Sequence, residues 1–301
     1  MSGTICIIGF GEAGTVFASE LASLTHVRVY DILRHAAEFN SSLASFQKQG
    51  IEFPVSAAQA GDGAKLIVSL VTASSSLDVA REAEAYLQPG QVLLDLNSVS
   101  PGTKKASAVI VERTGAIYVD GAVMAPVQPR GLAVPILLAG KGSALAVDLL
   151  AGFGMNLEIV ADEVGVASAT KMCRSVIIKG IEALCSEAFL AARAYGVESR
   201  VLSSLHDTFP GIDWPRFAGY QVGRSLVHGR RRAAEMREVS TTMREAGIAP
   251  LMSSATALRQ DWAADLSDSN PDLKARRDDE WLDTLDLMLA IGSRNDRTSD
   301  F

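Results

Sequence analysis

Short apolar runs alternate with helical patterns through the first half of the chain. Compact apolar runs between turn residues are typical of buried strands, whereas apolar residues at helical spacing are typical of amphipathic helices. Strands are predicted at Thr4–Ile8, Val27–Asp31, Leu66–Val71, Val92–Leu96, Ile117–Asp120, Val134–Ala139 and Leu157–Val160. Helices are predicted between them at Glu12–Leu24, Leu77–Leu87, Thr103–Arg113 and Ser143–Ala151. The alternation predicts a mostly parallel sheet covered by helices.

One of these predicted strands contains Pro135. Proline has no backbone N–H to donate to a strand ladder, so we expect strand Val134–Ala139 at an edge of the sheet.

After Asp162 the pattern becomes that of helices alone. Adjacent apolar pairs recur at helical spacing in Met172/Cys173, Val176/Ile177, Gly180/Ile181, Leu184/Cys185 and Ala188/Phe189. They predict one long helix from about Asp162 to Tyr195, with a broad apolar face and an end at Gly196. Helices broken at Pro210–Gly211, Gly247–Pro250 and Ser267–Pro271 should follow. The predicted fold class is α/β, with a doubly wound sheet over residues 1–162 and an all-α domain over residues 163–301 that begins with the long helix.

Composition excludes several classes of protein. Hydrophobic residues make up 48% and charged residues 21%, which is globular usage, and the net charge of −7 argues against a nucleic acid partner. No basic segment precedes the first apolar stretch and no apolar run approaches ~20 residues, so we expect a soluble, cytoplasmic protein without a signal peptide or membrane contact. The scattered histidines and Cys6, Cys173 and Cys185 lack metal-ligand spacing, which predicts no metal and three buried free thiols.

A glycine-rich turn joins the first predicted strand to the first predicted helix. Its sequence is Gly9-Phe10-Gly11-Glu12-Ala13-Gly14, a G-x-G-x-x-G in the strand–turn–helix context that the motif requires. Gly9 allows the tight turn, Gly11 leaves room for a pyrophosphate, and Gly14 lets helix and strand pack closely. The free N–H groups of the helix N-terminus would bind the phosphates. The first domain is therefore predicted to be a Rossmann-type dinucleotide-binding domain.

The choice between NAD and NADP depends on the end of the second strand. Asp31 lies near the offset expected for an acid that binds the adenosine ribose hydroxyls, and its charge would repel a 2′-phosphate. This favours NAD. Arg34 could reverse the preference by pairing with the phosphate, although its position favours a solvated turn residue over a cofactor contact. Val71 and Thr72, after the strand that begins at Leu66, are further predicted cofactor contacts.

The glycine-rich start, the order of segments and the long helix together resemble the β-hydroxyacid dehydrogenase family, the relatives of 6-phosphogluconate dehydrogenase and 3-hydroxyisobutyrate dehydrogenase. The segment Asp95-Leu96-Asn97-Ser98-Val99-Ser100-Pro101 resembles the D-x-S-T-x-x-P of that family, beside the nicotinamide. The resemblance implies that Asn97 contacts the cofactor and Ser98 the substrate, although a loop with helix-capping residues would look similar.

A second segment, Asp120-Gly121-Ala122-Val123, resembles the start of the family's substrate motif D-A-P-V-S-G-G, and the match then fails. Met124 takes the place of the substrate-binding serine, and Ala125-Pro126 replace the two glycines. Val123 and Met124 remain predicted substrate contacts. A thioether cannot hold a carboxylate as a hydroxyl can.

The long predicted helix carries the candidate catalytic group. Gly165-Val166-Ala167-Ser168-Ala169-Thr170-Lys171 resembles the family's G-x-G-x-x-x-K, in which the lysine moves the proton of the substrate hydroxyl. On the same helix face follow Arg174, Ser175 and Ile178, where 6-phosphogluconate dehydrogenase has His, Asn and Glu. Ile178 cannot act as an acid, so decarboxylation is not expected. Ser175 could donate to a substrate oxygen, and Arg174 could bind an anionic group or be solvated.

The run from His228 to Met236 contains three consecutive arginines. They could pair with Glu235 and Glu238 at helical spacing, or His228 or Arg231 could supply the cation that the family normally places near this point. The run also resembles a less-studied branch of the family with a distinct C-terminal domain.

The resemblance implies an NAD(P)-dependent oxidoreductase that acts on CH–OH groups of a small hydroxy acid or polyol acid, with Lys171 as general acid/base. An anionic substrate is compatible with the composition. A homodimer formed through the helical domain is expected. A dinucleotide sensor without turnover and an imine reductase are the alternatives; imine reductases of this fold typically replace the lysine.

Overall fold

The structure is a computed structural model that describes residues 3–296, with the backbone alone described for residues 37, 38, 40–42 and 292–296. The chain divides into two compact units, residues 1–172 and residues 173–301. This division falls inside helix α7 (Val166–Ala194), whereas the sequence analysis places the domain boundary before that helix.

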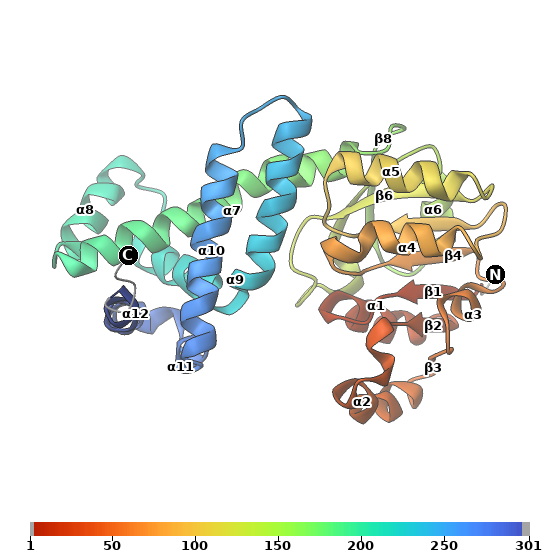
Figure 1. Cartoon of the computed structure of the whole chain (residues 1–301), viewed down its shortest axis with the longest axis horizontal. Helices are drawn as coiled ribbons and strands as arrows, with labels where there is room; N and C mark the ends of the chain where they lie inside the picture. The colour runs from red at the N-terminus through yellow and green to blue at the C-terminus, as the bar shows by residue number, and fades with distance from the viewer. Residues whose placement is uncertain (1–2, 297–301) are drawn as a thin grey trace. The chain divides into compact units, whose positions relative to one another are not determined.

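Unit 1 is built on an eight-stranded sheet with the strand order β3-β2-β1-β4-β5-β6-β7-β8 (Figure 1). All neighbouring strands are parallel except β6 and β7, which are antiparallel. The strands are β1 (Ile5–Ile8), β2 (Val27–Tyr30), β3 (Ile51–Glu52), β4 (Leu66–Ser69), β5 (Val92–Asp95), β6 (Ile117–Val123), β7 (Pro135–Ala139) and β8 (Asn156–Ala161). This mostly parallel, Rossmann-type sheet confirms the predicted fold class.

Helices cover both faces of the sheet because its strands are apolar on both sides. In β1, Ile5 and Ile7 join one core cluster, and Cys6 and Ile8 join the other. The helices of unit 1 are α1 (Glu12–Ala22), α2 (Ala37–Gln47), α3 (Ala57–Gly61), α4 (Ser76–Ala83), α5 (Pro101–Glu112) and α6 (Ser143–Leu149). Residues of α1 and α6 pack in the first cluster, and residues of α3, α4 and α5 pack in the second. The sequence pattern missed α2, α3 and β3, which are short or weakly periodic.

The predicted edge position of the strand containing Pro135 is wrong. Strand β7 lies between β6 and β8, and β8 forms the edge. Pro135 is the first residue of β7, a place where no N–H is needed, and its carbonyl accepts a hydrogen bond from Met124 N at 2.9 Å. A proline at the start of a strand therefore does not force that strand to the edge.

In the described part of unit 2, residues 173–296, the regular elements are helices, as the sequence predicts. After α7 come α8 (Glu198–Thr208), α9 (Trp214–Glu245), α10 (Leu251–Ser269), α11 (Asp272–Ala275) and α12 (Trp281–Asp296). Its core joins apolar residues of α7, α9, α10, α11 and α12. Helices α9 and α10 approach closely at Gly229, where a Cβ would meet the carbonyl oxygen of Gln260 at 2.6 Å. This contact explains the glycine inside the arginine-rich run.

The long helix buries part of its predicted apolar face within unit 2. Cys185 and Phe189 lie in the core, whereas Ile177 is 64% exposed and Leu184 is 57% exposed. Cys173 is also exposed, so the expectation of three buried thiols is wrong for this cysteine. Burial raises the pKa of the Cys6 thiol to about 12 and that of Cys185 to about 11.

Candidate active site

The glycine-rich turn has the geometry of a phosphate-binding loop. Gly9 adopts a left-handed φ of 102°, and a Cβ on Gly14 would collide with the carbonyl oxygen of Gly9. Nothing lies within 4 Å of the position that a Cβ on Gly11 would take. No side chain caps the first turn of α1, where Glu12, Ala13 and Gly14 present their N–H groups. An open space in front of these N–H groups fits a pyrophosphate.

Asp31 connects the end of β2 to this loop. Its Oδ2 accepts a hydrogen bond from Phe10 N at 2.6 Å, and its Oδ1 accepts one from Leu33 N at 2.7 Å. The Phe10 ring packs edge-on against Phe46, with 4.9 Å between the ring centroids. Asp31 therefore fixes the turn, and its carboxylate is half-buried. Arg34 donates to the carbonyl of Pro54 at 2.8 Å, which makes it a fixed turn residue.

Asn97 fixes the neighbouring end of β4. Its Oδ1 accepts a hydrogen bond from Val71 N at 2.7 Å, and its Nδ2 donates to Ser69 Oγ at 2.9 Å and to Ser76 Oγ at 3.2 Å. Asn97 is 4% exposed, and both its amide oxygen and its amide nitrogen are hydrogen-bonded within the protein. Asn97 thus positions Val71 rather than presenting its own side chain. Thr72, next to Val71, is exposed.

Lys171 and Ser98 meet at the carboxyl end of β5. Lys171 Nζ donates a hydrogen bond to Ser98 Oγ at 2.6 Å, and both side chains are half-buried. The two residues are 73 positions apart, and the sequence predicted both for the site without predicting their contact. Val123 is the last residue of β6 and Met124 follows it; both are half-buried. Met124 N is bonded to Pro135 O, so this amide is not available for a substrate carboxylate.

A buried lysine that sequence reasoning missed lies beneath this part of unit 1. Lys104 of α5 has no exposed side-chain surface, and its Nζ lies 2.9 Å from Asp95 Oδ1 and 3.6 Å from Asp120 Oδ1. Nζ also donates to the carbonyl of Asp95 at 2.6 Å. Tyr118 donates to Asp95 Oδ2 at 2.6 Å, and burial beside Asp95 raises the pKa of the Tyr118 phenol well above its usual range, so it stays a donor.

Asp120 joins this cluster to the helix that carries Lys171. Its Oδ2 accepts hydrogen bonds from Gly165 N at 3.0 Å and from Ser168 N at 3.1 Å, at the start of α7. A carboxylate at a helix N-terminus also interacts favourably with the helix dipole. Asp95, which precedes Ser98, and Asp120, which holds the start of α7, therefore share Lys104. The sequence signal was a pair of aspartates in neighbouring strands, Asp95 at the end of β5 and Asp120 within β6.

The predicted site residues of unit 2 lie on α7 and α9. Arg174 is exposed, and Ser175 is 5% exposed with its Oγ accepting a hydrogen bond from Lys179 Nζ at 3.0 Å. Arg231 lies 3.2 Å from Glu235 one helical turn away, as the spacing predicted. Arg232 instead pairs with Glu182 of α7 at 2.7 Å. Burial raises the pKa of the Glu182 carboxyl.

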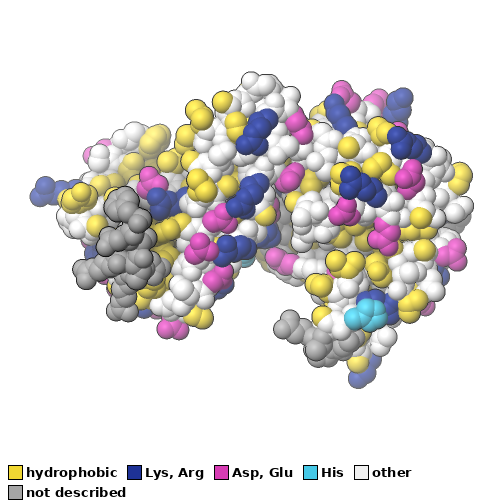
Figure 2. Space-filling model, viewed as in Figure 1, with side chains coloured by type: hydrophobic (Ala, Val, Ile, Leu, Met, Phe, Trp, Pro, Cys, Tyr) yellow, Lys and Arg dark blue, Asp and Glu magenta, His cyan; other side chains and the backbone are white. Residues whose placement is uncertain are grey.

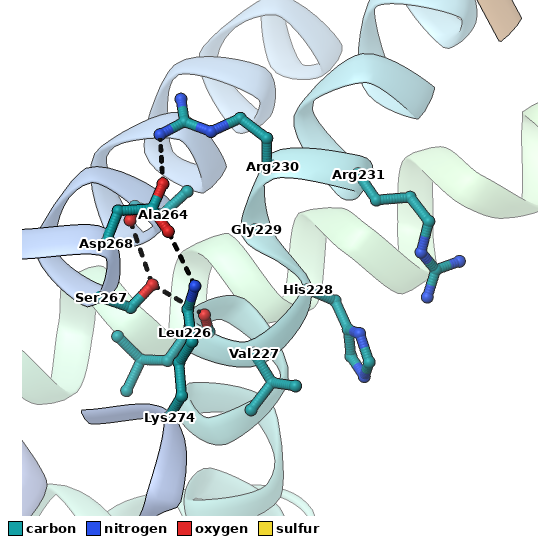
Figure 3. Close-up of a pocket in the computed structure, with 10 residues that line it drawn as sticks. All are labelled: Leu226, Val227, His228, Gly229, Arg230, Arg231, Ala264, Ser267, Asp268 and Lys274. Atoms are coloured by element: carbon teal, nitrogen blue, oxygen red, sulfur yellow. Dashed lines mark hydrogen bonds and ion pairs between the residues drawn. The ribbon is translucent and has the colours of Figure 1, made fainter. Parts of the chain in front are cut away.

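His228 and Arg231 also line a cavity of about 230 Å³ between α9, α10 and α11. In Figure 3 both side chains point away from the group formed by Arg230, Asp268 and Lys274. Within that group, Arg230 and Lys274 each bind Asp268, at 2.8 and 2.7 Å. The structure therefore divides the arginine-rich run: Arg230 binds α10, Arg231 stays on the surface of α9, and Arg232 is buried against α7.

The visible surface carries interspersed acidic and basic side chains (Figure 2). None of the described helices is long and apolar enough to cross a membrane.

The fold and the glycine-rich loop define the class of an NAD(P)-binding oxidoreductase. Residues 4–131 match the NAD-binding domain of 6-phosphogluconate dehydrogenase, and residues 192–263 match a domain of unknown function, DUF1932.

The chain belongs to the β-hydroxyacid dehydrogenase family, to a branch with a distinct C-terminal domain. It is 34% identical to a conserved hypothetical protein from Sinorhizobium meliloti, with 96% of each chain covered and a TM-score of 0.76. It is 30% identical to a conserved protein of unknown function that is structurally similar to 3-hydroxyacid dehydrogenases, with 87% of this chain and 97% of that chain covered and a TM-score of 0.69. Human mitochondrial 3-hydroxyisobutyrate dehydrogenase is 24% identical over 69% of this chain, and the match spans 62% of the human protein.

Proposed function

We propose that the protein oxidises a CH–OH group of a small hydroxy acid or related polyol acid with a nicotinamide dinucleotide, without decarboxylation. The observation that carries the proposal is the 2.6 Å contact between Lys171 Nζ and Ser98 Oγ. It lies at the carboxyl end of β5, the strand between β4 and β6. Ligands of open α/β sheets bind at this end of the strands. The similarity to 3-hydroxyisobutyrate dehydrogenase supports a hydroxy acid as the substrate class.

In this proposal Lys171 is the general base. Its amine takes the proton of the substrate hydroxyl, and it returns the proton as an acid in the reverse direction. Ser98, which accepts from Lys171, donates its own hydrogen to the reacting oxygen or to the cofactor carboxamide. A bound oxidised nicotinamide would supply the acceptor for the hydride that leaves the carbon bearing this hydroxyl.

The cofactor is expected to be NAD rather than NADP. The half-buried carboxylate of Asp31 would accept hydrogen bonds from the ribose hydroxyls and repel a 2′-phosphate. Arg34, the residue that could have favoured the phosphate, is bonded to Pro54 O.

The substrate is expected to be anionic. Arg174 is exposed one helical turn after Lys171, and its guanidinium could bind a carboxylate through bidentate hydrogen bonds. Ile178, on the following turn, offers no proton for a decarboxylation intermediate.

The first experiment is a spectrophotometric assay of cofactor reduction with the purified chain, a panel of hydroxy acids and polyols, and NAD and NADP in parallel. Turnover with a panel member that is greater with NAD than with NADP supports both parts of the proposal. Lys171→Ala should lower kcat by about 10²–10⁴-fold and leave NAD affinity unchanged. If the protein binds NAD but no member of the panel causes NAD reduction, the result favours a dinucleotide sensor over a dehydrogenase.

We further propose that the helical domain, residues 163–301, contributes to substrate binding and joins two copies of the chain. Ile177 and Leu184 expose apolar surface on α7, and so do Leu251 and Leu258 on α10, at 76% and 70%. Surfaces of this kind mark interaction sites. Light scattering should give twice the mass of one chain, and Ile177→Glu with Leu184→Glu should return it to the mass of a monomer.

A further inference from the structure

Lys179 is a buried cation to which the proposed chemistry assigns no part. It lies on α7 two helical turns after Lys171 and is 7% exposed. Its Nζ lies 3.0 Å from Ser175 Oγ on its own helix and 3.0 Å from Glu235 Oε2 on α9. Glu235 in turn lies 3.2 Å from Arg231. Burying an ammonium group is costly, and the pairing with Glu235 offsets that cost.

The contact with Lys179 determines how Ser175 can bind a ligand. An ammonium group has donors only, so in this pair the Ser175 hydroxyl must accept. Its single hydrogen is then directed elsewhere, and among the described side chains and backbone groups the structure gives it no protein acceptor. A hydroxyl that accepts from a charged donor becomes a better donor itself, because hydrogen bonds in a chain polarise one another.

We propose that Lys179 is a positioning residue that fixes the Ser175 hydroxyl as a donor to a carboxylate or carbonyl oxygen of the substrate. This rests on the proposed function, in which Ser175 binds the substrate, and it narrows the substrate class. The Ser175 subsite selects an oxygen acceptor and disfavours a protonated amine, because Ser175 has no acceptor role left to offer and Lys179 adds a positive charge.

A double-mutant cycle separates this role from a purely structural one. The four proteins are the wild type, Ser175→Ala, Lys179→Met and the double variant, assayed with NAD and the best panel acid. Each single substitution should lower kcat/KM by about tenfold, the value of one hydrogen bond to a charged group. The double variant should be no worse than Ser175→Ala alone, because in this proposal Lys179 acts on the substrate only through the Ser175 hydroxyl.

A second pair of variants controls for folding. Lys179→Met leaves Glu235 without one of its cations, so Tm should fall, and adding Glu235→Gln should recover most of that loss. The pair Lys179→Met/Glu235→Gln should keep the tenfold loss of kcat/KM. Lys141→Met, a surface lysine of unit 1, is the matched control and should change neither quantity.

The outcomes are distinct. Recovery of both Tm and kcat/KM in Lys179→Met/Glu235→Gln, or additive losses in the Ser175/Lys179 cycle, would overturn the role of Lys179 and leave the proposed function intact. If the wild type turns over no panel acid, the same cycle is measured as calorimetric affinity of the NAD-loaded protein for the panel acids. A non-additive cycle in affinity supports the positioning role while the dehydrogenase proposal fails; no binding of any acid overturns both.

Discussion

The two units each bury a lysine, and the two lysines are held in different ways. Lys104 of unit 1 is enclosed by Asp95, Asp120 and backbone carbonyls, all from strands or strand ends of the sheet. Lys179 of unit 2 has one carboxylate and one serine. The first lysine is therefore the shared cation of two buried carboxylates, and all its contacts are structural. The second lysine leaves a serine hydroxyl with a hydrogen to donate. Two buried lysines of one protein thus need not have the same role.

The largest effect on stability is expected at Lys104. Lys104→Met should lower the free energy of unfolding by about 3–5 kcal/mol, because Asp95 and Asp120 would be left buried without their cation. Chemical denaturation of the whole chain measures this change. Lys105 is the matched control: it is 54% exposed and pairs with Glu163 on the surface, so Lys105→Met should leave the denaturation midpoint where it is. Equal losses for the two variants would show that the buried pairing of Lys104 with Asp95 and Asp120 does not stabilise the fold more than a surface ion pair does.

A smaller loss is expected at Lys179. Lys179→Met should cost about 1–3 kcal/mol, since Glu235 is only partly buried and keeps Arg231 as a partner. A loss as large as that of Lys104→Met would make Lys179 a structural residue of the same kind and remove the contrast between the units.

The smallest effect is expected for an exposed ion-pair group in unit 2. Arg230 pairs with Asp265 at 2.7 Å and with Asp268 at 2.8 Å, yet its side chain is 59% exposed. Solvent and salt screen such pairs, so Arg230→Ala should leave Tm unchanged within error. A clear decrease in Tm that persists in high salt would indicate that the contact between α9 and α10 at this point is more than a surface pair.

Much of the fold could be predicted from the sequence because the relevant signals are local. Apolar runs marked seven of the eight strands, and the glycine-rich turn lies between β1 and α1, where the sequence predicts it. The edge position expected for the strand with Pro135 was wrong, because the rule depends on where in the strand the proline falls. The predicted strand begins at Val134, whereas β7 begins at Pro135, so the proline takes the first position of the strand, where its missing N–H is tolerated.

The candidate site could be predicted only in part. Lys171 and Ser98 were both expected, since each lies in a motif that resembles the family. Lys104 and Lys179 were missed, because a lysine in a helix is ordinarily solvated and nothing in its neighbours along the chain shows that it is buried. The cofactor contact expected of Asn97 stays a prediction, and the structure adds that its amide is bonded to Val71, Ser69 and Ser76.

The sequence by itself determined the order of elements, the change from α/β to all-helical structure and the place of the phosphate loop. Each follows from periodicity or from backbone freedom within a few residues. Only the tertiary structure decided which charges are buried and what each one binds. Glu235 lies far along the chain from Lys179, and Asp120 lies far from the helix start that it caps. The stability of a buried charge depends on such partners, and they are brought together only when the helices and strands pack.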